Sequence, residues 1–424
     1  MHQRLLVRFT RSMALVMVFG LFGASAALAQ VKGYVPNYNV STVSVIDTAT
    51  QTVTATIPVG APNLPSWAVY SPDGTRVYVS IHAGSLLVID TATDTVTSTM
   101  TVPGANADSI AISPDGATLY SVGGSTSDLT VIDTATLTVT GTIPLGAGAT
   151  AIALTPDGAR AYVTTNPFAG TVTVIDTTTN SVIATIPGVP FPSAIAIAPN
   201  GTAYVTNNGL FFAMLNTVTA IDTATNTVSA TIPVGMAPAG VAISPDGARA
   251  YVANSLDSTL SVIDTATNTV IATVPSGASD PFGVSVTPDG ASVYVANYTS
   301  GLVTVIDTAT NTLTATISAG LYPVVVAFPP PRSLTPKDQV QALIDAIDAL
   351  IAGGDLAQNT AAPLLNKLEQ VLAKLDGGQT GAACNQLSAF VNQVNAYVAH
   401  GSLTAAEGQS LIDAVNAIRS QLGC

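Results

Sequence analysis

Residues 239–275 read AGVAISPDGARAYVANSLDSTLSVIDTATNTVIATVP, and this stretch decides the fold. It contains four short runs rich in β-branched residues: AGVAIS, RAYVAN, STLSVID and TVIATVP. Turn sequences separate them, among them Pro245-Asp246-Gly247 and the tetrapeptide TATN. Alternating runs of this length, bounded by Pro, Asp, Asn and Gly, are typical of antiparallel strands joined by hairpins. The stretch therefore predicts a four-stranded antiparallel sheet.

The same unit occurs seven times. Its Ile-Asp-Thr motif recurs at spacings of 43, 43, 43, 46, 42 and 43 residues, with the Asp at Asp47, Asp90, Asp133, Asp176, Asp222, Asp264 and Asp307. A fixed period in this range marks a propeller or a solenoid. Four antiparallel strands per repeat favour a propeller blade over a solenoid coil. We therefore expect a mainly β protein built as a seven-bladed β-propeller over residues 30–328.

The two ends of the repeat array favour a closed ring. The array begins at a second strand, GYVPNY (residues 33–38), and ends after a first strand, YPVVVAF (residues 322–328). Neither end holds a complete blade, but together they supply one. We expect the last strand to complete the sheet that the first three strands begin.

The first strand of each repeat alternates in size. Five residues before the turn Pro, most repeats carry a small residue, such as Ala151, Gly240 or Gly283, and the next residue is mostly Ile or Val. Because successive side chains point to opposite faces of a strand, each blade has a small face and a large face near the axis. We expect the large face of one blade to pack on the small face of its neighbour.

The N-terminus reads as a signal peptide over residues 1–29. Three Arg precede an apolar run, residues 13–22, and Ala27-Leu28-Ala29 fits the cleavage rule. A membrane anchor is the alternative, but the run is short for a bilayer span. Without these Arg, 9 basic residues remain against 25 acidic ones, a net charge near −16. This charge argues against nucleic acid and anionic membranes as partners, and the rest of the chain predicts no membrane span.

After the repeats, a Pro-rich linker over residues 329–336 leads to a helical domain over residues 337–424. Apolar residues recur there with helical spacing, and the segment from Ala342 repeats from Ala389 at an offset of 47 residues. Two such helical hairpins predict a four-helix bundle. Thr404 and Glu407 form a capping box at the start of the last helix. The antiparallel hairpin about Gly401 brings Cys384 and Cys424 to one end, and we expect a disulfide there.

Both parts resemble known families. The repeats are similar to YVTN-family β-propellers, on the sequences YVTT from Tyr162, YVTN from Tyr204, and YVAN from Tyr251 and Tyr294. LYSV at Tyr120 and APNG at Ala198 depart mildly from that pattern. The second helical hairpin, residues 390–418, resembles the FIMAH domain, an extracellular bacterial module. These resemblances imply an exported or cell-surface protein, and they imply no single activity.

Few side chains in the propeller can support catalysis. Residues 30–331 contain no Glu, no Cys, one His (His82), one Lys (Lys32) and three Arg (Arg76, Arg160 and Arg249). Lactonase- and lyase-like propellers use His and Glu on the axis, and one His cannot form a metal-binding ring. The periodic Asp residues fit turn roles. We therefore expect no catalytic residue, no metal site and no cofactor.

Irregular aromatic residues are the better functional candidates. Loops that lead into the first strands, or follow the second strands, carry Trp67, His82, Phe168, Phe191, Phe211, Phe212, Phe282, Tyr298 and Tyr322. Asp108 and Asp280 precede first strands without counterparts in other blades, and they are candidates for a cation or polar ligand or for solvated loop charges. The aromatic residues either form a binding face or cap the blade ends, and Trp67 could also plug the channel.

We therefore expect an exported, non-catalytic binding or cell-surface scaffold module for a protein, peptide or glycan. The alternatives are a lactonase- or lyase-like enzyme and a passive, surface-layer-like structural protein of the cell envelope.

Overall fold

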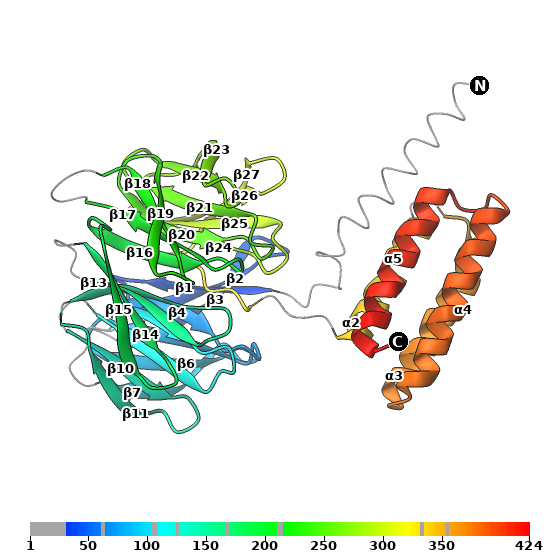
Figure 1. The fold of residues 1–424 in the computed structure, drawn as a ribbon, viewed down its shortest axis with the longest axis horizontal. Helices are drawn as coiled ribbons and strands as arrows, with labels where there is room; N and C mark the ends of the chain where they lie inside the picture. Colours follow the sequence, from blue (N-terminus) through cyan, green and yellow to red (C-terminus); the bar gives the residue numbers. More distant parts are fainter. Residues whose placement is uncertain are drawn as a thin grey trace. The chain divides into compact units, whose positions relative to one another are not determined.

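The computed structural model describes residues 31–60, 64–102, 108–123, 127–146, 148–165, 170–209, 215–330, 335–352 and 356–424. Contacts divide these residues into two compact units, one within residues 30–331 and one within residues 332–424 (Figure 1). The predicted signal peptide, residues 1–29, lies outside the described residues.

The first unit is a seven-bladed β-propeller, as the repeat predicts. Blade 1 contains β1 (Lys32–Asn37), β2 (Thr42–Asp47) and β3 (Thr52–Pro58). Blade 2 contains β4 (Pro65–Tyr70), β5 (Arg76–Ile81), β6 (Ser85–Asp90) and β7 (Thr95–Thr101), and blade 3 contains β8 (Ser109–Ile112), β9 (Thr118–Val122), β10 (Asp128–Asp133) and β11 (Thr138–Pro144). Blade 4 contains β12 (Ala149–Leu154), β13 (Arg160–Thr165), β14 (Thr171–Asp176) and β15 (Ser181–Pro187).

The remaining blades repeat this order. Blade 5 contains β16 (Pro192–Ile197), β17 (Thr202–Asn207), β18 (Thr217–Asp222) and β19 (Thr227–Pro233), and blade 6 contains β20 (Pro238–Ile243), β21 (Arg249–Asn254), β22 (Thr259–Asp264) and β23 (Thr269–Pro275). Blade 7 contains β24 (Pro281–Val286), β25 (Ser292–Asn297), β26 (Leu302–Asp307) and β27 (Thr312–Ser318). Within each blade, neighbouring strands pair antiparallel.

Residues 322–327 close the ring by pairing with β1. The Tyr34 amide donates to the Ala327 carbonyl at 3.0 Å, and the Ala327 amide donates to the Tyr34 carbonyl at 2.8 Å. Tyr38 and Pro36 pair with residues 322–324 in the same way. The first and last parts of the array therefore share blade 1, as predicted, and the ring has no open seam.

Packing between blades follows the alternation of the inner strands. Ile152 packs on Tyr120 and Val122 of the preceding blade, and the Ile and Val residues at equivalent positions do the same. On the small side, a Cβ added at Gly240 would lie 2.3 Å from the Phe282 carbonyl oxygen of the next blade. The predicted contact of large and small faces is therefore confirmed at these positions.

The second unit contains four helices, α2 (Pro336–Ala352), α3 (Gln358–Asp376), α4 (Thr380–Ala399) and α5 (Ala405–Leu422). Leu343, Leu364, Phe390 and Val415, one from each helix, lie in its core. The predicted capping box of Thr404 and Glu407 is present. A disulfide joins Cys384 to Cys424, as predicted, with Cα atoms 6.1 Å apart. None of the described helices has the length and apolarity needed to cross a membrane.

Candidate functional site

The propeller has two faces that carry different connections. The turn face holds the Pro-Asp-Gly turns and the turns between third and fourth strands, such as residues 244–248 and 265–268. The loop face holds the connections between blades and the loops after second strands, such as residues 276–280 and 298–301. Backbone bonds join the two sets of loops: the Tyr298 amide donates to the Asp280 carbonyl at 2.9 Å, and the Tyr38 amide donates to the Tyr322 carbonyl at 3.0 Å.

Five aromatic side chains form a continuous contact series on the loop face, which we call the aromatic arc: Phe282, Tyr298, Tyr322, Tyr38 and His82. The Tyr298 ring centroid lies 5.7 Å from Phe282, 5.1 Å from Tyr322 and 6.4 Å from Tyr38. The Tyr38 ring in turn lies 5.8 Å from His82. The arc therefore extends across blades 7, 1 and 2, over the place where the ring closes.

Backbone conformation helps to position the arc. Asp280 and Tyr322 occupy equivalent positions, directly before Pro281 and Pro323, and both have left-handed backbones with φ of 58° and 57°. Phe191 takes the same conformation before β16, with φ of 46°. Ala237 before β20 does so as well, with φ of 53°, so this conformation belongs to the repeat and not to the arc alone. In these loops it turns the chain so that the carbonyl accepts a bond from the neighbouring loop.

A carboxylate lies at each end of the arc. Asp108 contacts His82, with Oδ1 2.5 Å from Nδ1. At the other end, burial raises the pKa of Asp280, although a hydrogen bond from Thr299 opposes the rise. The Tyr38 pKa is raised by burial and by the charge of Asp108, and the Tyr298 pKa by burial, by Tyr38 and Tyr322, and by Asp280. The arc is therefore a partly buried aromatic surface with a carboxyl group at each end, one of which contacts His82.

The basic side chains of the propeller lie on the opposite face. Lys32, Arg76, Arg160 and Arg249 are each the first residue of a second strand, next to the turn face. Lys32 Nζ lies 2.8 Å from Asp94 Oδ2, and the guanidinium groups of Arg160 and Arg249 donate to carbonyls of Thr223 and Thr308. Residues 30–331 contain no other Lys or Arg. The loop face therefore carries no Lys or Arg.

The periodic Asp residues have the predicted turn roles. Oδ1 of Asp222 accepts bonds from the Ala224 and Thr225 amides at 2.8 and 3.1 Å, and other members of the series do the same. Asp246 of a Pro-Asp-Gly turn accepts bonds from Ser244 and Ala248, which lower its pKa. Among the described residues, no group of three or more His, Cys, Asp or Glu could hold a metal ion.

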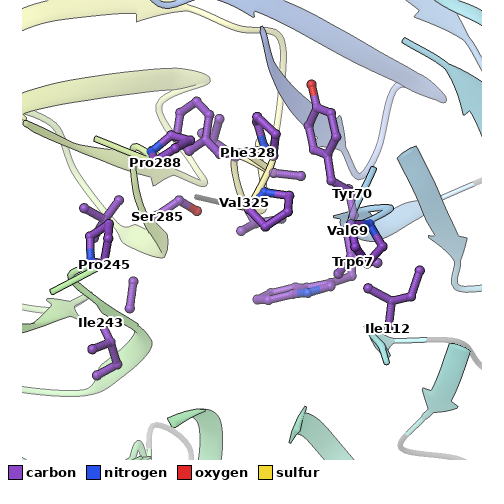
Figure 2. A pocket seen from close by; sticks show the side chains of 18 of the residues that line it. Trp67, Val69, Tyr70, Ile112, Ile243, Pro245, Ser285, Pro288, Val325 and Phe328 are labelled. Atoms are coloured by element: carbon purple, nitrogen blue, oxygen red, sulfur yellow. The ribbon is translucent and has the colours of Figure 1, made fainter. Parts of the chain in front are cut away.

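A separate apolar cavity of about 570 Å³ lies where the inner strands reach the turn face. Trp67, Ile112, Ile243, Val325 and Phe328 are among its lining residues. Figure 2 shows the Trp67 indole extending from its strand into the open centre, with Ile112 beside it and Pro245 on the opposite side. Trp67 therefore lies within strand β4 and lines this cavity, whereas the sequence placed it with the loop aromatics.

The structure brings together only some of the candidate residues. His82, Phe282, Tyr298 and Tyr322 meet in the arc. Phe191 lies at the equivalent loop position of blade 5, where its carbonyl accepts a bond from the Asn208 amide. Phe168, Phe211 and Phe212 lie outside the described residues.

Sequence reasoning missed Tyr38, which joins the two halves of the arc. Tyr38, His82 and Tyr298 each follow the last residue of a second strand, β1, β5 and β25. Aligning the seven repeats by their second strands would have placed all three at one position.

Comparison with known protein families gives a match for each of the two parts of the chain. Residues 340–420 match the FIMAH domain, and residues 212–336 match the YNCE-like beta-propeller. The chain therefore carries a FIMAH domain at its C-terminus, and its propeller is of the YVTN type, as the sequence predicted. No curated protein sequence matches the chain.

Three solved structures are similar to the propeller. Hydrazine synthase of Kuenenia stuttgartiensis is 22% identical over 63% of this chain and 90% of its own, with a TM-score of 0.57. Dihydro-heme d1 dehydrogenase NirN, in complex with DHE, is 15% identical over 69% and 73%, with a TM-score of 0.53. A functionally unknown protein from Desulfotomaculum acetoxidans DSM 771 is 19% identical over 71% and 99%, with a TM-score of 0.62. At these identities the likeness shows the fold alone, on which proteins of mixed function are built.

Proposed function

We propose that this chain is an exported, non-catalytic module that binds a protein, peptide or glycan partner through the aromatic arc. The observation that carries the proposal is the contact series from Phe282 to His82, which crosses three blades on a rigid ring. The Phe282 side chain is 38% exposed although it is large and apolar. Aromatic groups held by a rigid scaffold are typical of binding surfaces, because they contribute large contact area at low entropic cost.

Export is supported by the C-terminal unit. The Cys384–Cys424 disulfide fits an oxidising compartment, and the FIMAH domain fits a cell-surface protein. The signal peptide predicted over residues 1–29 is consistent with export. A direct test is N-terminal sequencing of the protein recovered from the producing cells, with Gln30 expected as the first residue.

The non-catalytic part of the proposal depends on the side chains present. The propeller has a single His, and the periodic Asp residues of its turns bond their own backbone. Within the propeller sequence His82 is the one His, and its contact with Asp108 lies beside aromatic rings, with no Cys or Glu in the propeller to act as a nucleophile. Binding therefore accounts for this surface better than hydrolysis or elimination.

The binding role can be tested with the mature protein. The parent protein and a variant carrying Phe282→Ala and Tyr298→Ala are each immobilised, and the amount of native cell-envelope material that each retains is compared. We expect the variant to lose retention while its melting temperature changes little, because both side chains lie at the surface of blade 7. Phe191→Ala is the control, since Phe191 is a loop-face aromatic residue of blade 5, at the position of Asp280, and lies outside the arc. Equal retention by all three proteins would show that the arc is not the binding surface.

A further inference from the structure

We infer that the aromatic arc recognises an organic cation, namely the ammonium or guanidinium group of Lys or Arg side chains on a basic peptide segment. This inference rests on the proposed function and names the ligand class for the same surface. It follows from the mutual tilt of the rings, from the carboxylates at both ends, and from the placement of every Lys and Arg of the propeller on the other face.

The ring geometry favours a cation over a flat ligand. Neighbouring rings of the arc are inclined to one another by 41° to 67°. A sugar ring stacks best on a single flat aromatic face, whereas inclined rings can present several faces to one point. The face of an aromatic ring carries negative potential, so a cation near several ring faces is attracted by each of them. Tilted tyrosines are therefore better suited to an ammonium or guanidinium group.

The charges around the arc have the matching sign. Burial raises the pKa of both Tyr298 and Tyr38, and the nearby carboxylates of Asp280 and Asp108 add to the rise, so both carboxylates lie close enough to act on these tyrosines. No Lys or Arg of the propeller lies on this face to neutralise them. His82 is the one titratable base nearby, and its Nδ1 already contacts Asp108. An incoming cation would therefore meet attraction from Asp280 and from the ring faces.

The length of the arc favours a peptide over a single small cation. The two carboxylates that flank the arc are Asp280, directly before blade 7, and Asp108, directly before blade 3. One ammonium group can occupy only one part of such a surface. A peptide with two basic side chains could place one near Asp280 and Tyr298 and the other near Tyr38 and Asp108, while its backbone crosses Tyr322.

The test uses the mature protein and defined probes. Binding is measured by calorimetry for a blocked hexapeptide containing two Lys, for the same peptide with Arg, and for the same peptide with norleucine. We expect the Lys and Arg peptides to bind at low salt, the affinity to fall as NaCl is added, and the norleucine peptide to bind about tenfold more weakly or not at all. Tetramethylammonium chloride should compete with the Lys peptide.

Variants separate the contributions of rings and charges. Tyr298→Leu should weaken binding of the Lys peptide about tenfold, and Tyr298→Phe should retain it, because the ring face rather than the hydroxyl makes the contact. Asp280→Asn should weaken binding about fivefold. Asp257→Asn is the matched control, since Asp257 is an exposed loop-face carboxylate outside the arc, and it should change binding less than twofold. Circular dichroism melting confirms that each variant is folded.

The outcomes distinguish this inference from the proposed function. If the norleucine peptide binds as well as the Lys peptide, or if Asp280→Asn has no effect, the cation inference is wrong. If Tyr298→Leu then still loses binding of a neutral peptide or glycan, the arc is a binding surface for another ligand class. If Tyr298→Leu leaves all binding unchanged, the proposed site itself is wrong.

Discussion

Asp280 combines two features that are unfavourable in a folded chain. Its backbone is left-handed, with φ of 58°, and its burial raises the pKa of the carboxyl group. A raised pKa means that the folded state holds the proton more tightly than the unfolded chain does. Stability therefore falls as the pH rises from the ordinary Asp value of about 3.9 through the raised pKa, and it stays lower above that.

We predict that Asp280→Asn raises the melting temperature at pH 7. The amide cannot ionise, so the variant lacks the cost of a partly buried charge, and Asn also tolerates a left-handed backbone. The gain should shrink as the pH approaches 3, where the parent carboxyl is protonated in both states. Thermal melts of both proteins between pH 3 and pH 8 measure this, and a variant less stable than the parent at pH 7 would contradict it.

At the scale of strands, the inner strands of blades 6, 7 and 1 approach too closely for side chains at two positions. A Cβ added at Gly283 would lie 2.0 Å from the Val324 carbonyl oxygen and 2.9 Å from the Val325 Cα. The obstructing atoms belong to backbone, so they can move only if the blades separate. Gly240 meets Phe282 and Gly283 of the next blade in the same way.

We predict that Gly283→Ala lowers the free energy of unfolding by about 1–3 kcal/mol or more, because the inserted methyl group forces two blades apart. Gly141→Ala is the matched control. Gly141 also lies in a strand, β11, but nothing lies within 4 Å of an added Cβ, and the change should stabilise by about 0.5–1 kcal/mol. Denaturant titrations of both variants measure the free energy of unfolding. Equal changes in the two variants would show that the close approach of the inner strands does not exclude a side chain at Gly283.

The signature Tyr of the second strand ties blade 4 to blade 5 and blade 5 to blade 6. The Tyr162 hydroxyl donates to Asn226 Oδ1 at 2.6 Å, and Tyr204 donates to Asn268 at 2.7 Å. Both Asn residues lie in turns between third and fourth strands of the following blade, with positive φ. This contact gives the recurring Tyr and Asn a shared structural role at these two interfaces.

We predict that Tyr162→Phe lowers the free energy of unfolding by about 1 kcal/mol, since the bond lies in the buried interface between blades. Asn226→Gly keeps the positive φ, so a double-mutant cycle of the two changes should show coupling of about 1 kcal/mol. Asn311→Gly lies in the equivalent turn of blade 7, where Asn311 Oδ1 has no hydrogen-bond partner. The effect of Asn311→Gly on the free energy of unfolding should add to that of Tyr162→Phe without coupling. Coupling of Tyr162→Phe with Asn311→Gly as well as with Asn226→Gly would contradict a specific bond between Tyr162 and Asn226.

At the scale of the whole molecule, the two compact units are stabilised by different means. Ring closure through Tyr34 and Ala327 stabilises the propeller, because it leaves no blade with an unpaired inner edge at a seam. The helical unit has a smaller core, and the disulfide ties the start of α4 to the last residue of the chain.

We predict that Cys384→Ser with Cys424→Ser destabilises the helical unit alone. The bond closes a loop with a sequence separation of 40 residues, for which chain entropy gives a loss of about 3–4 kcal/mol. Thermal melting of the full chain, followed at 222 nm for the helices, should show a lower transition for them and an unchanged propeller transition. A shift of both transitions would show that the two units unfold together.

Much of this architecture could be read from local patterns. The period of about 43 residues determines the blades, because each repeat must bury its apolar runs against the next. The split blade follows from which strands begin and end the array. The disulfide follows from the helical period, since an antiparallel hairpin brings Cys384 and Cys424 to one end. These features depend on residues whose spacing along the chain is itself the signal.

The functional surface depended on tertiary structure. Tyr38 and Tyr322 lie near opposite ends of the repeat array, yet ring closure pairs their backbones and places both rings beside Tyr298. The repeat pattern shows which residues occupy equivalent positions in the blades. It does not show which loops lie side by side in the folded ring, so it does not show which aromatic residues meet. Likewise, the position of Trp67 in β4 rather than in a loop placed it at the apolar cavity near the turn face. The sequence therefore determined the blades and the helices by itself, whereas closure of the ring decided which aromatic side chains meet, because only closure makes the two ends of the array neighbours.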